Sequence, residues 1–322
     1  MWDWYKYDMV KPINEQSKII IAIGDSFTEG HGACSTELWE KCNWDLNNIP
    51  DNMGYEYQKS YYENSWVHQL CRDHLTDYIP VNLGMTGRGN RGPIKELYLH
   101  PEIGMERAKE KIVVLMLSGY ERFDFVHREF NQHIHYQTMW PKITHDKNQK
   151  DLWEAYGEYV FSDRVAIIEM LLGIAEVKTW CKAHNADLIV TSAFRVDYKR
   201  EQFVNLILND CECNEGKTPN YLKEQVEYVN RIVDIVNWDN FLYPNGFGCF
   251  SDYLLHLEDL DKLTNNYDEN LFYKYGQSLD KLSPKGYITN CSHPSIKGHE
   301  AIAKTIYEHI KSDKLKNKSK IL

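Results

Sequence analysis

The sequence predicts an α/β protein whose parallel sheet is covered by helices on both faces. Three short apolar stretches, at residues 19–23, 112–117 and 187–192, carry this prediction, because they are rich in Ile, Val and Leu and have the length of strands. Segments with helical spacing separate them along the chain. Buried strands that alternate with helices are typical of a parallel sheet in a three-layer α/β/α sandwich.

The individual elements follow this alternation in order. A helix is predicted at 65–75, where three large apolar residues recur at helical spacing. The later elements are a strand at 81–83, a helix near 93–99, the strand at 112–117, a helix near 163–184, the strand at 187–192, and helices at 221–236 and 295–310. In such sheets the active site lies at the carboxyl ends of the strands, and Ser26, Gly84 and Gly119 each follow such an end.

Three long segments, at about 33–62, 125–159 and 195–287, do not follow the alternation. They are polar and rich in aromatic residues, so we expect them to be insertions above the strand ends, where they would wall a pocket. The chain contains no internal repeat and no Gly/Ser-rich or Pro-rich linker. We therefore expect residues 1–322 to form a single domain with insertions.

Composition excludes two classes of partner. Of the 322 residues 43% are hydrophobic, which is enough for a substantial core, and the formal net charge is −10. With no dense basic tract, the chain is not expected to bind nucleic acid. Its longest apolar runs fall well short of the ~20 residues that span a bilayer, so no membrane association is expected.

The N-terminal residues lack the apolar core of a secretion signal, and we expect a cytoplasmic protein. The abundance of Asn, Lys, Ile and Tyr suits an A+T-rich genome such as that of many phages, in which case the virion is the alternative location.

The eight cysteines form no CxxC pair, which indicates reduced thiols. His133 and His135 are not completed by further ligands at suitable spacing, so no metal is expected. We expect no organic cofactor either.

Ser26 is the first candidate for chemistry. It lies in residues 19–30, IIIAIGDSFTEG, directly after the first predicted strand. A serine hydroxyl becomes a nucleophile when a base takes its proton and hydrogen-bond donors hold the oxyanion that forms. The glycine that an α/β-hydrolase nucleophile elbow requires two residues after the serine is missing, so that fold is disfavoured. The alternative role of Ser26 is to cap the following turn.

Three blocks resemble the SGNH (GDSL-type) hydrolases, and they occur in the order of that family. They are GDSFTEG at 24–30, NLGMTG at 82–87 and SHPSIKGH at 292–299. The resemblance implies a flavodoxin-like sheet and a serine esterase in which Ser26 is the nucleophile, the Gly84 N–H is an oxyanion donor and His293 is the general base. The alternative role of His293 is that of a helix-entry residue.

Two positions depart from the family. Glu121, in SGYERFD at 118–124, stands where the family has an asparagine that donates to the oxyanion. We expect Arg122 to replace it, because a guanidinium carries five donors; an ordinary Glu–Arg surface pair is the alternative. Asn290 stands where the family has the aspartate of the triad.

An asparagine in place of that aspartate costs ~10⁴ in rate in a Ser-His-Asp triad, chiefly through the wrong imidazole tautomer. We expect Asn290 to orient His293 weakly, or an acid elsewhere, such as Asp252 or Asp280, to assist.

The remaining candidates are expected to bind substrate at the rim of the sheet. They are Asp25, Arg88, Asn90, Gly119 and Glu121. Arg88 and Asn90 follow the second block, where they would hold an anionic group or a sugar hydroxyl.

The sequence thus predicts hydrolysis of a small acyl ester, with an O-acetyl group on a carbohydrate as the first candidate. The alternative is a catalytically impaired binding module or a structural module of a virion or tail, working within a virion or a homo-oligomeric assembly. A nucleotide-binding protein is disfavoured, because Asp25 would place a carboxylate beside the phosphate and no glycine-rich cradle is present.

Overall fold

The computed structural model describes residues 11–45, 48–99, 101–130, 133–139, 154–194, 200–209, 219–238, 241–260 and 271–312. Its main sheet has four parallel strands in the order β2-β1-β3-β6. The strands are β1 (Lys18–Ile23), β2 (Tyr78–Asn82), β3 (Glu110–Leu117) and β6 (Asp187–Ser192).

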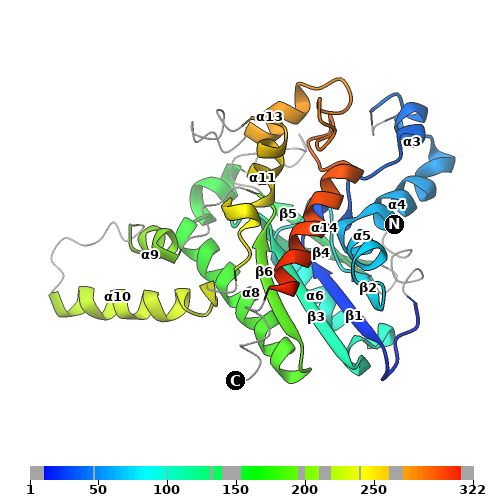
Figure 1. The fold of residues 1–322 in the computed structure, drawn as a ribbon. Helices are drawn as coiled ribbons and strands as arrows, with labels where there is room; N and C mark the ends of the chain where they lie inside the picture. Colours follow the sequence, from blue (N-terminus) through cyan, green and yellow to red (C-terminus); the bar gives the residue numbers. More distant parts are fainter. Residues whose placement is uncertain are drawn as a thin grey trace.

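A parallel bridge between Val190 and Phe241 continues the sheet by one position beyond β6. The order of the parallel strands is therefore flavodoxin-like, with helices on both faces (Figure 1). The predicted three-layer α/β/α class is confirmed.

The unbroken apolar run of β1 is explained by burial on both faces. Because successive side chains of a strand point to opposite faces, Ile19, Ile21 and Ile23 enter one core cluster. Ile20 and Ala22 enter another on the opposite face. Neither face of this strand meets solvent, so alternation of polar and apolar residues is absent.

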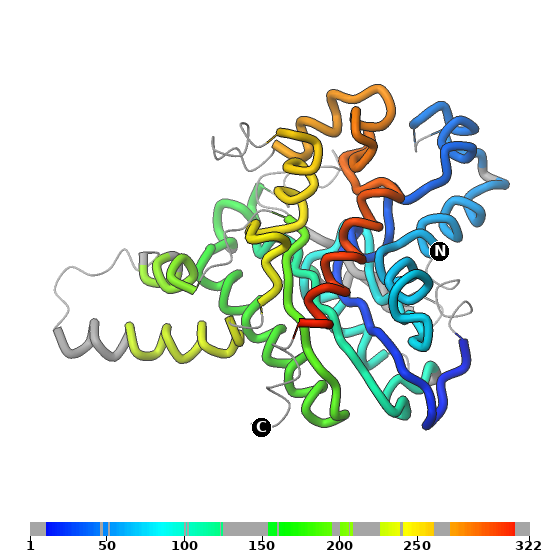
Figure 2. Tube along the Cα trace, in the orientation of Figure 1, coloured from blue at the N-terminus to red at the C-terminus, as the bar shows by residue number. Residues whose placement is uncertain are grey.

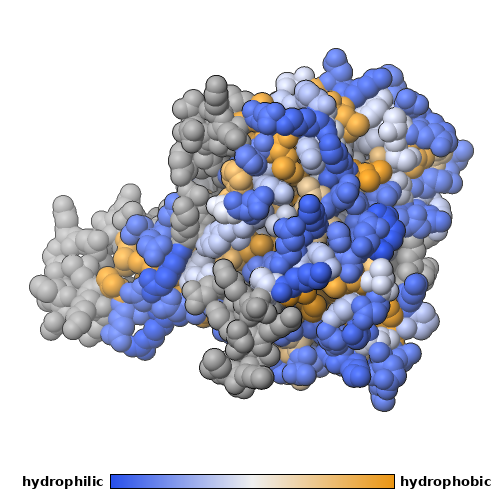
Figure 3. All heavy atoms as spheres, in the orientation of Figure 1, coloured by the Kyte–Doolittle hydropathy of each residue, from blue (hydrophilic) through white to orange (hydrophobic). Residues whose placement is uncertain are grey.

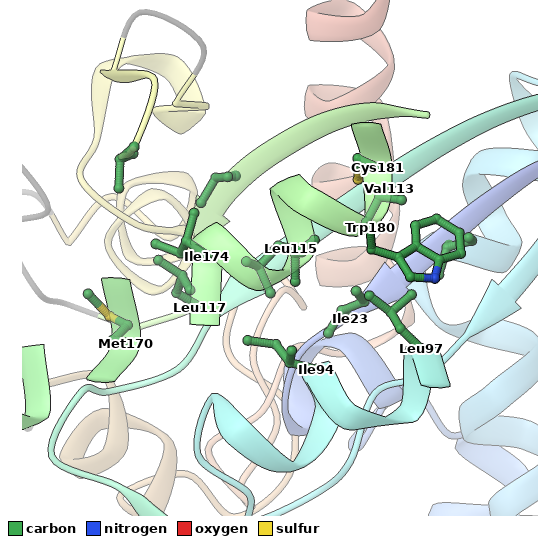
Figure 4. Packing of buried hydrophobic residues seen from close by; sticks show 14 of the residues in the cluster. Ile23, Ile94, Leu97, Val113, Leu115, Leu117, Met170, Ile174, Trp180 and Cys181 are labelled. Carbon is green, nitrogen blue, oxygen red and sulfur yellow. The ribbon is translucent and has the colours of Figure 1, made fainter. Parts of the chain in front are cut away.

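The first helical layer consists of α6 (Arg91–Leu99) and α8 (Asp163–Ala183). Figure 4 shows side chains of these helices over those of the strands; the labelled residues are Ile23, Ile94, Leu97, Val113, Leu115, Leu117, Met170, Ile174, Trp180 and Cys181. The same cluster includes residues of α9 (Arg200–Asn209) and α10 (Pro219–Val233). These two helices extend outward beside α8 (Figure 2).

The second helical layer covers the opposite face. It consists of α5 (Trp66–Asp73), α11 (Phe250–Leu257), α13 (Leu271–Gln277) and α14 (Ile296–Lys311). Trp66 and Ile302 are fully buried where α5 packs against α14. A backbone N–H at the start of α5 also donates to a buried imidazole of α14, from Trp66 N to His299 Nδ1 at 3.2 Å.

The segments expected to be insertions have structure of their own. Residues 33–62 form α3 (Thr36–Lys41), a 3₁₀ turn (Asp51–Met53) and α4 (Gly54–Asn64). Residues near 125–159 include an antiparallel hairpin of β4 (Phe123–Phe130) and β5 (His133–Met139), and a π-helical turn (Tyr156–Val160).

The segment 195–287 is more than an insertion, because α11 adds Phe250 and Leu254 to the core under the sheet. Three further 3₁₀ turns connect the main elements: Pro101–Ile103, Met105–Arg107 and Pro244–Gly246.

Hydrophilic residues dominate the face shown in Figure 3, and the apolar ones lie in small separate groups. Among the described residues, no helix combines the length and the apolar character needed to cross a membrane.

Candidate active site

Ser26 begins a single helical turn at the carboxyl end of β1. This turn, α2 (Ser26–Glu29), is capped by Asp25, whose Oδ1 accepts a hydrogen bond from Phe27 N at 3.0 Å. Gly24 must be glycine, because a Cβ at that position would lie 2.7 Å from the Met116 carbonyl oxygen. The turn ends at Gly30, which has a φ of 105° in the left-handed region. Ser26 is thereby held almost entirely buried at the strand end, with 3% of its surface exposed.

His293 reaches Ser26 from the far end of the chain. Its Nε2 lies 3.0 Å from Ser26 Oγ, although the two residues are 267 positions apart. Its Nδ1 lies 2.7 Å from the backbone oxygen of Cys291. A carbonyl oxygen can only accept, so Nδ1 carries the ring proton and Nε2 presents its lone pair to the serine hydroxyl. This is the tautomer that a general base requires.

The backbone of residues 289–293 forms the turn that creates this contact. Ser292 has a φ of 60°, and its N–H donates to the Thr289 oxygen at 3.0 Å. Thr289 N donates in turn to the His293 oxygen at 2.9 Å, which closes the loop. The chain folds back so tightly that the His293 ring meets the carbonyl of Cys291, two residues earlier. Helix α14 then begins after Ser295, whose hydroxyl caps it.

Asn290 does not orient the imidazole, contrary to the expectation from sequence. Its Nδ2 donates to the backbone oxygens of Trp44 at 2.6 Å and Asp280 at 3.2 Å. The Trp44 and Asp280 carbonyl oxygens flank the Asn290 side chain and provide acceptors for its amide nitrogen. Nδ1 of His293 is already bonded to the Cys291 carbonyl, so neither Asn290 nor the alternative acids hold that nitrogen.

Burial keeps the candidate base neutral. It lowers the pKa of His293 well below the ordinary histidine value; the neighbouring His31 lowers this pKa further, and the hydrogen bond to the Cys291 carbonyl opposes both effects. Burial also raises the pKa of Asp25, and the positive charge of Arg122 offsets part of that rise. Around neutral pH the His293 Nε2 is therefore unprotonated and accepts from the Ser26 hydroxyl.

Arg122 forms a buried ion pair and is neither a surface residue nor an evident oxyanion donor. Its Nη1 donates to Asp25 Oδ2 and to the Arg88 backbone oxygen, both at 3.2 Å. Its Nη2 donates to the Tyr273 hydroxyl at 3.1 Å, and the guanidinium carbon lies 4.8 Å from the centre of the Phe194 ring. Only 7% of the side chain is exposed. The guanidinium thus ties together the loops that surround Ser26.

Gly84 and Asn90 also connect loops. The Gly84 N–H, expected to be an oxyanion donor, donates to Asn82 Oδ1 at 2.9 Å and so already has a protein acceptor. Asn82 Nδ2 donates to the Thr28 oxygen at 2.9 Å, which ties the end of β2 to α2. The Asn90 side chain brackets the backbone of Ser118, accepting from its N at 2.8 Å and donating to its oxygen at 3.3 Å. Asn90 therefore binds protein and not substrate.

The loop after β3 is folded around two carboxylates. The Glu121 carboxylate lies against Gly119, so closely that a Cβ there would be 2.2 Å from Glu121 Oε1. Asp124 accepts from Gly89 N at 2.8 Å and from Gly92 N at 2.9 Å, at the start of α6. The sequence offered no role for Asp124, which here fixes the loop that follows β2.

Two backbone N–H groups, one in α2 and one in the loop after β2, have no acceptor among the described residues. Within the part of the chain that the structure describes, no hydrogen bond uses the N–H of Ser26 or of Gly87. Gly87 has a φ of 73° and open space where a Cβ would be. Its neighbours anchor it beside α2, because Thr86 N donates to Glu29 Oε2 at 2.7 Å and the Arg88 oxygen accepts from the buried guanidinium. The only sequence feature that pointed to Gly87 was its place in the same block as Gly84, residues 82–87.

A cavity of about 140 Å³ lies on the α8 side of the Arg122 loop. Asn90, Arg122 and Asp124 contribute to its lining, whereas Ser26 and His293 are not among its described lining residues. The cavity is thus separate from the Ser26–His293 pair. In Figure 1, α3, α11 and α13 lie toward the end of the sheet at which β1 terminates.

No protein-family model matches the chain, and no curated protein matches it in sequence. Among solved structures, the chain is similar to the crystal structure of an acetyl xylan esterase, AlAXEase. The two share 13% sequence identity and a TM-score of 0.34, over 90% of this chain and 98% of that one. A likeness of this size assigns neither a family nor an activity.

Proposed function

We propose that this protein is a serine esterase in which Ser26 is the nucleophile and His293 the general base. One observation carries the proposal: the chain of contacts from Ser26 Oγ to His293 Nε2, at 3.0 Å, and from His293 Nδ1 to the Cys291 carbonyl, at 2.7 Å. A neutral imidazole held in this tautomer and pointed at a buried hydroxyl is the arrangement that general-base activation requires.

The proposed reaction has two halves. Ser26 Oγ bonds to the acyl carbon of the ester while its proton moves to His293 Nε2. The tetrahedral intermediate collapses, the bond to the leaving oxygen breaks, and that oxygen takes the proton from Nε2. Water then attacks the acyl-serine, gives one proton to Nε2 and releases the carboxylic acid, and Ser26 regains its proton.

The N–H groups of Ser26 and Gly87 are the proposed oxyanion donors. Both lack a partner among the described residues, and both belong to loops that the Arg122–Asp25 ion pair and Asn82 hold in place. Backbone donors already positioned before the reaction supply most of the stabilisation in sites of this kind. We assign Arg122 to positioning these loops.

Because a backbone carbonyl holds Nδ1 where a Ser-His-Asp triad has a carboxylate, we expect His293 to act as a base but more slowly than in such a triad. The tautomer of His293 is correct, so the main cause of the ~10⁴ loss seen with asparagine in a Ser-His-Asp triad is absent. The imidazolium that forms during the reaction is stabilised by a dipole and lacks a full negative charge beside it. We therefore expect activity on esters with good leaving groups to exceed that on unactivated ones.

The restricted access to the pair favours a small acyl group. Ser26 is almost fully buried and His293 is partly buried. The half-buried ring of His31 lies between the His293 ring, at 4.3 Å between centroids, and that of Tyr61, at 5.2 Å. An acetyl group on a carbohydrate is the substrate class that we propose, because the partly exposed ring of His31 beside the site suits the face of a sugar.

The test is the hydrolysis of p-nitrophenyl acetate and of acetylated sugars by four proteins. Ser26→Ala and His293→Ala should each lose at least about 10⁴-fold in kcat/KM. The matched control Ser278→Ala removes an exposed hydroxyl whose only described bond is to the Tyr275 oxygen, and it should keep full activity. Equal turnover by all four proteins would show that the site is not an esterase. If acetate is released from p-nitrophenyl acetate but from none of the acetylated sugars, a carbohydrate is not the substrate.

A further inference from the structure

Three side chains beside the proposed base form a cluster of metal-binding atoms. One ligand atom each from His31, Cys291 and His293 lie within 4.8 Å of one another, and all three residues are partly buried. The sequence shows no metal-ligand spacing here, because His31 and the other two residues come from opposite ends of the chain. The fold alone assembles the group.

Two imidazoles and a thiol suit a borderline or soft divalent ion. Zn²⁺ binds these ligands at about 2.0–2.1 Å for nitrogen and about 2.3 Å for sulfur, so ligand atoms of a tetrahedral site lie roughly 3.5 Å apart. The present separations, up to 4.8 Å, require the side chains to close by roughly 1 Å. Mg²⁺ and Ca²⁺ prefer oxygen ligands and do not fit this set.

The backbone holds the three ligands at one place. His31 stands between Gly30 and Gly32, both in the left-handed region, and its N–H donates to the Ser26 oxygen at 3.0 Å. The Cys291 thiol has a polar neighbour in Thr289 Oγ1 at 3.0 Å. The three ligands thus sit on two short, well-fixed turns that meet at the nucleophile.

We propose that His31, Cys291 and His293 bind a Zn²⁺-class divalent ion and that this binding switches the esterase off. The metal–sulfur bond forms as the thiol releases its proton, and each imidazole donates a lone pair. If His293 binds through Nε2, the hydrogen bond to Ser26 is lost; if it binds through Nδ1, the bond to the Cys291 carbonyl is lost. Either way, His293 no longer serves as an oriented base. The inhibitory part of this proposal rests on the proposed function, whereas the binding site does not.

Metal binding is measured directly with Co²⁺, added to chelator-treated protein in place of Zn²⁺. The full chain should bind one equivalent and show the near-ultraviolet absorption of a cobalt–thiolate bond, which Zn²⁺ then displaces. Cys291→Ser should lose that absorption, and His31→Gln should weaken Co²⁺ binding at least about tenfold. The control His184→Gln, which removes a histidine that contacts Trp180 at the end of α8, should bind as the unaltered chain does.

Inhibition is measured separately, with each variant's rate divided by its own metal-free rate. The Zn²⁺ concentration that halves p-nitrophenyl acetate hydrolysis should rise at least about tenfold in Cys291→Ser and His31→Gln, and stay unchanged in His184→Gln. The metal site would be overturned if the unaltered chain showed no cobalt–thiolate band or if Cys291→Ser kept that band. Activation by Zn²⁺ would overturn its inhibitory role. A chain that binds Co²⁺ as described but hydrolyses no ester keeps the metal site and rejects only the proposed function.

Discussion

The imidazole of His293 takes its orientation from a main-chain oxygen. The 2.7 Å contact from Nδ1 to the Cys291 carbonyl selects the tautomer, and the left-handed φ of Ser292, 60°, bends the chain back to make it. The expected partner, Asn290, instead donates to Trp44 and Asp280 and so fastens the 289–293 turn to neighbouring segments. The asparagine is therefore explained by its own hydrogen bonds, with no need for a role as a weakened acid.

Asn290→Asp is not expected to restore a triad. A carboxylate at this position would face the carbonyl oxygens of Trp44 and Asp280, which now receive N–H donors at 2.6 and 3.2 Å. We expect kcat/KM to stay the same or fall, and the free energy of unfolding to fall by about 1–3 kcal/mol. Steady-state kinetics and urea unfolding measure the two quantities.

Asn290→Ser is the control for this substitution, because it removes the amide nitrogen that bonds the two carbonyls and adds no charge. It should lose less stability than Asn290→Asp when both are measured at pH 7. A tenfold or larger rise of kcat/KM in Asn290→Asp would mean that the carboxylate reaches His293 Nδ1 after all, and the assignment of the Cys291 carbonyl would then be wrong.

Three connections at the carboxyl ends of β1, β2 and β3 are locked to one another by side chains. Arg122, after β3, holds Asp25, after β1, at 3.2 Å, and Asn82 at the end of β2 donates to the Thr28 oxygen in α2 at 2.9 Å. Asp124 accepts from Gly89, which lies between β2 and α6, and from Gly92 in the first turn of α6. The position of Ser26 thus depends on loops from all three strands.

Arg122→Leu should destabilise the protein strongly, by about 3–5 kcal/mol, because it leaves the Asp25 carboxylate buried without its counter-ion. The pKa of Asp25 is already raised by burial, and loss of the guanidinium raises it further. A folded-state pKa above the unfolded value means that the folded state binds the extra proton, so stability is lost as pH rises through this pKa. The deficit measured by urea unfolding should therefore be larger at pH 8 than at pH 5.

The double variant Asp25→Asn/Arg122→Leu tests the cause of this loss. Asparagine keeps an oxygen to accept from Phe27 N and carries no charge, so the double variant should recover part of the stability and lose its pH dependence. If Arg122→Leu alone unfolds at the same urea concentration as the unaltered chain, the ion pair does not hold the loops together.

The sheet was predictable from sequence, whereas the contacts between its loops were not. Runs such as residues 19–23 and 112–117 are apolar on both faces, which fixes a parallel sheet and the edge at which Ser26 lies. The chemical roles of Ser26 and His293 remain predictions, although the structure places the two side chains 3.0 Å apart.

The partners of Arg122 and Asn290 escaped prediction because they are set by tertiary packing. Arg122 meets Asp25 and Tyr273, which are 97 and 151 residues away in sequence. Asn290 meets Trp44, which is 246 residues away. No periodicity or local spacing records such a choice, and a guanidinium or an amide that suits an oxyanion suits a carboxylate or a carbonyl equally well. The role of the Cys291 carbonyl could not be predicted for another reason, because a backbone group has no sequence signature.

Across the whole molecule, burial of histidines links stability to pH. Burial lowers the pKa of His68 and of His299 to about 3, and it also lowers those of His31 and His293. Below the ordinary histidine value of 6.5 the unfolded chain takes up these protons while the folded chain does not. Stability is therefore greatest above this pH and falls as the solution is acidified.

His68 and His299 make the largest defined contribution to this pH dependence. Each histidine that stays neutral only in the folded state contributes a slope of about 1.4 kcal/mol per pH unit between about pH 6 and pH 4, so His68 and His299 together contribute about 2.8. Urea unfolding at pH 7, 6, 5 and 4 measures it. His68→Gln should lower the slope of the unfolding free energy against pH by about 1.4 kcal/mol per pH unit. A free energy of unfolding that stays constant or rises on acidification would contradict the assignment of buried neutral imidazoles.

The central claim, that Ser26 and His293 form a nucleophile and its base, is tested most directly by a fluorophosphonate probe and mass mapping of the labelled peptide. We predict a single adduct on Ser26, formed at least about 10³-fold more slowly in His293→Ala and absent in Ser26→Ala, while Ser278→Ala is labelled like the unaltered chain. A folded protein that takes up no probe, or that carries the adduct on another serine, would contradict the account.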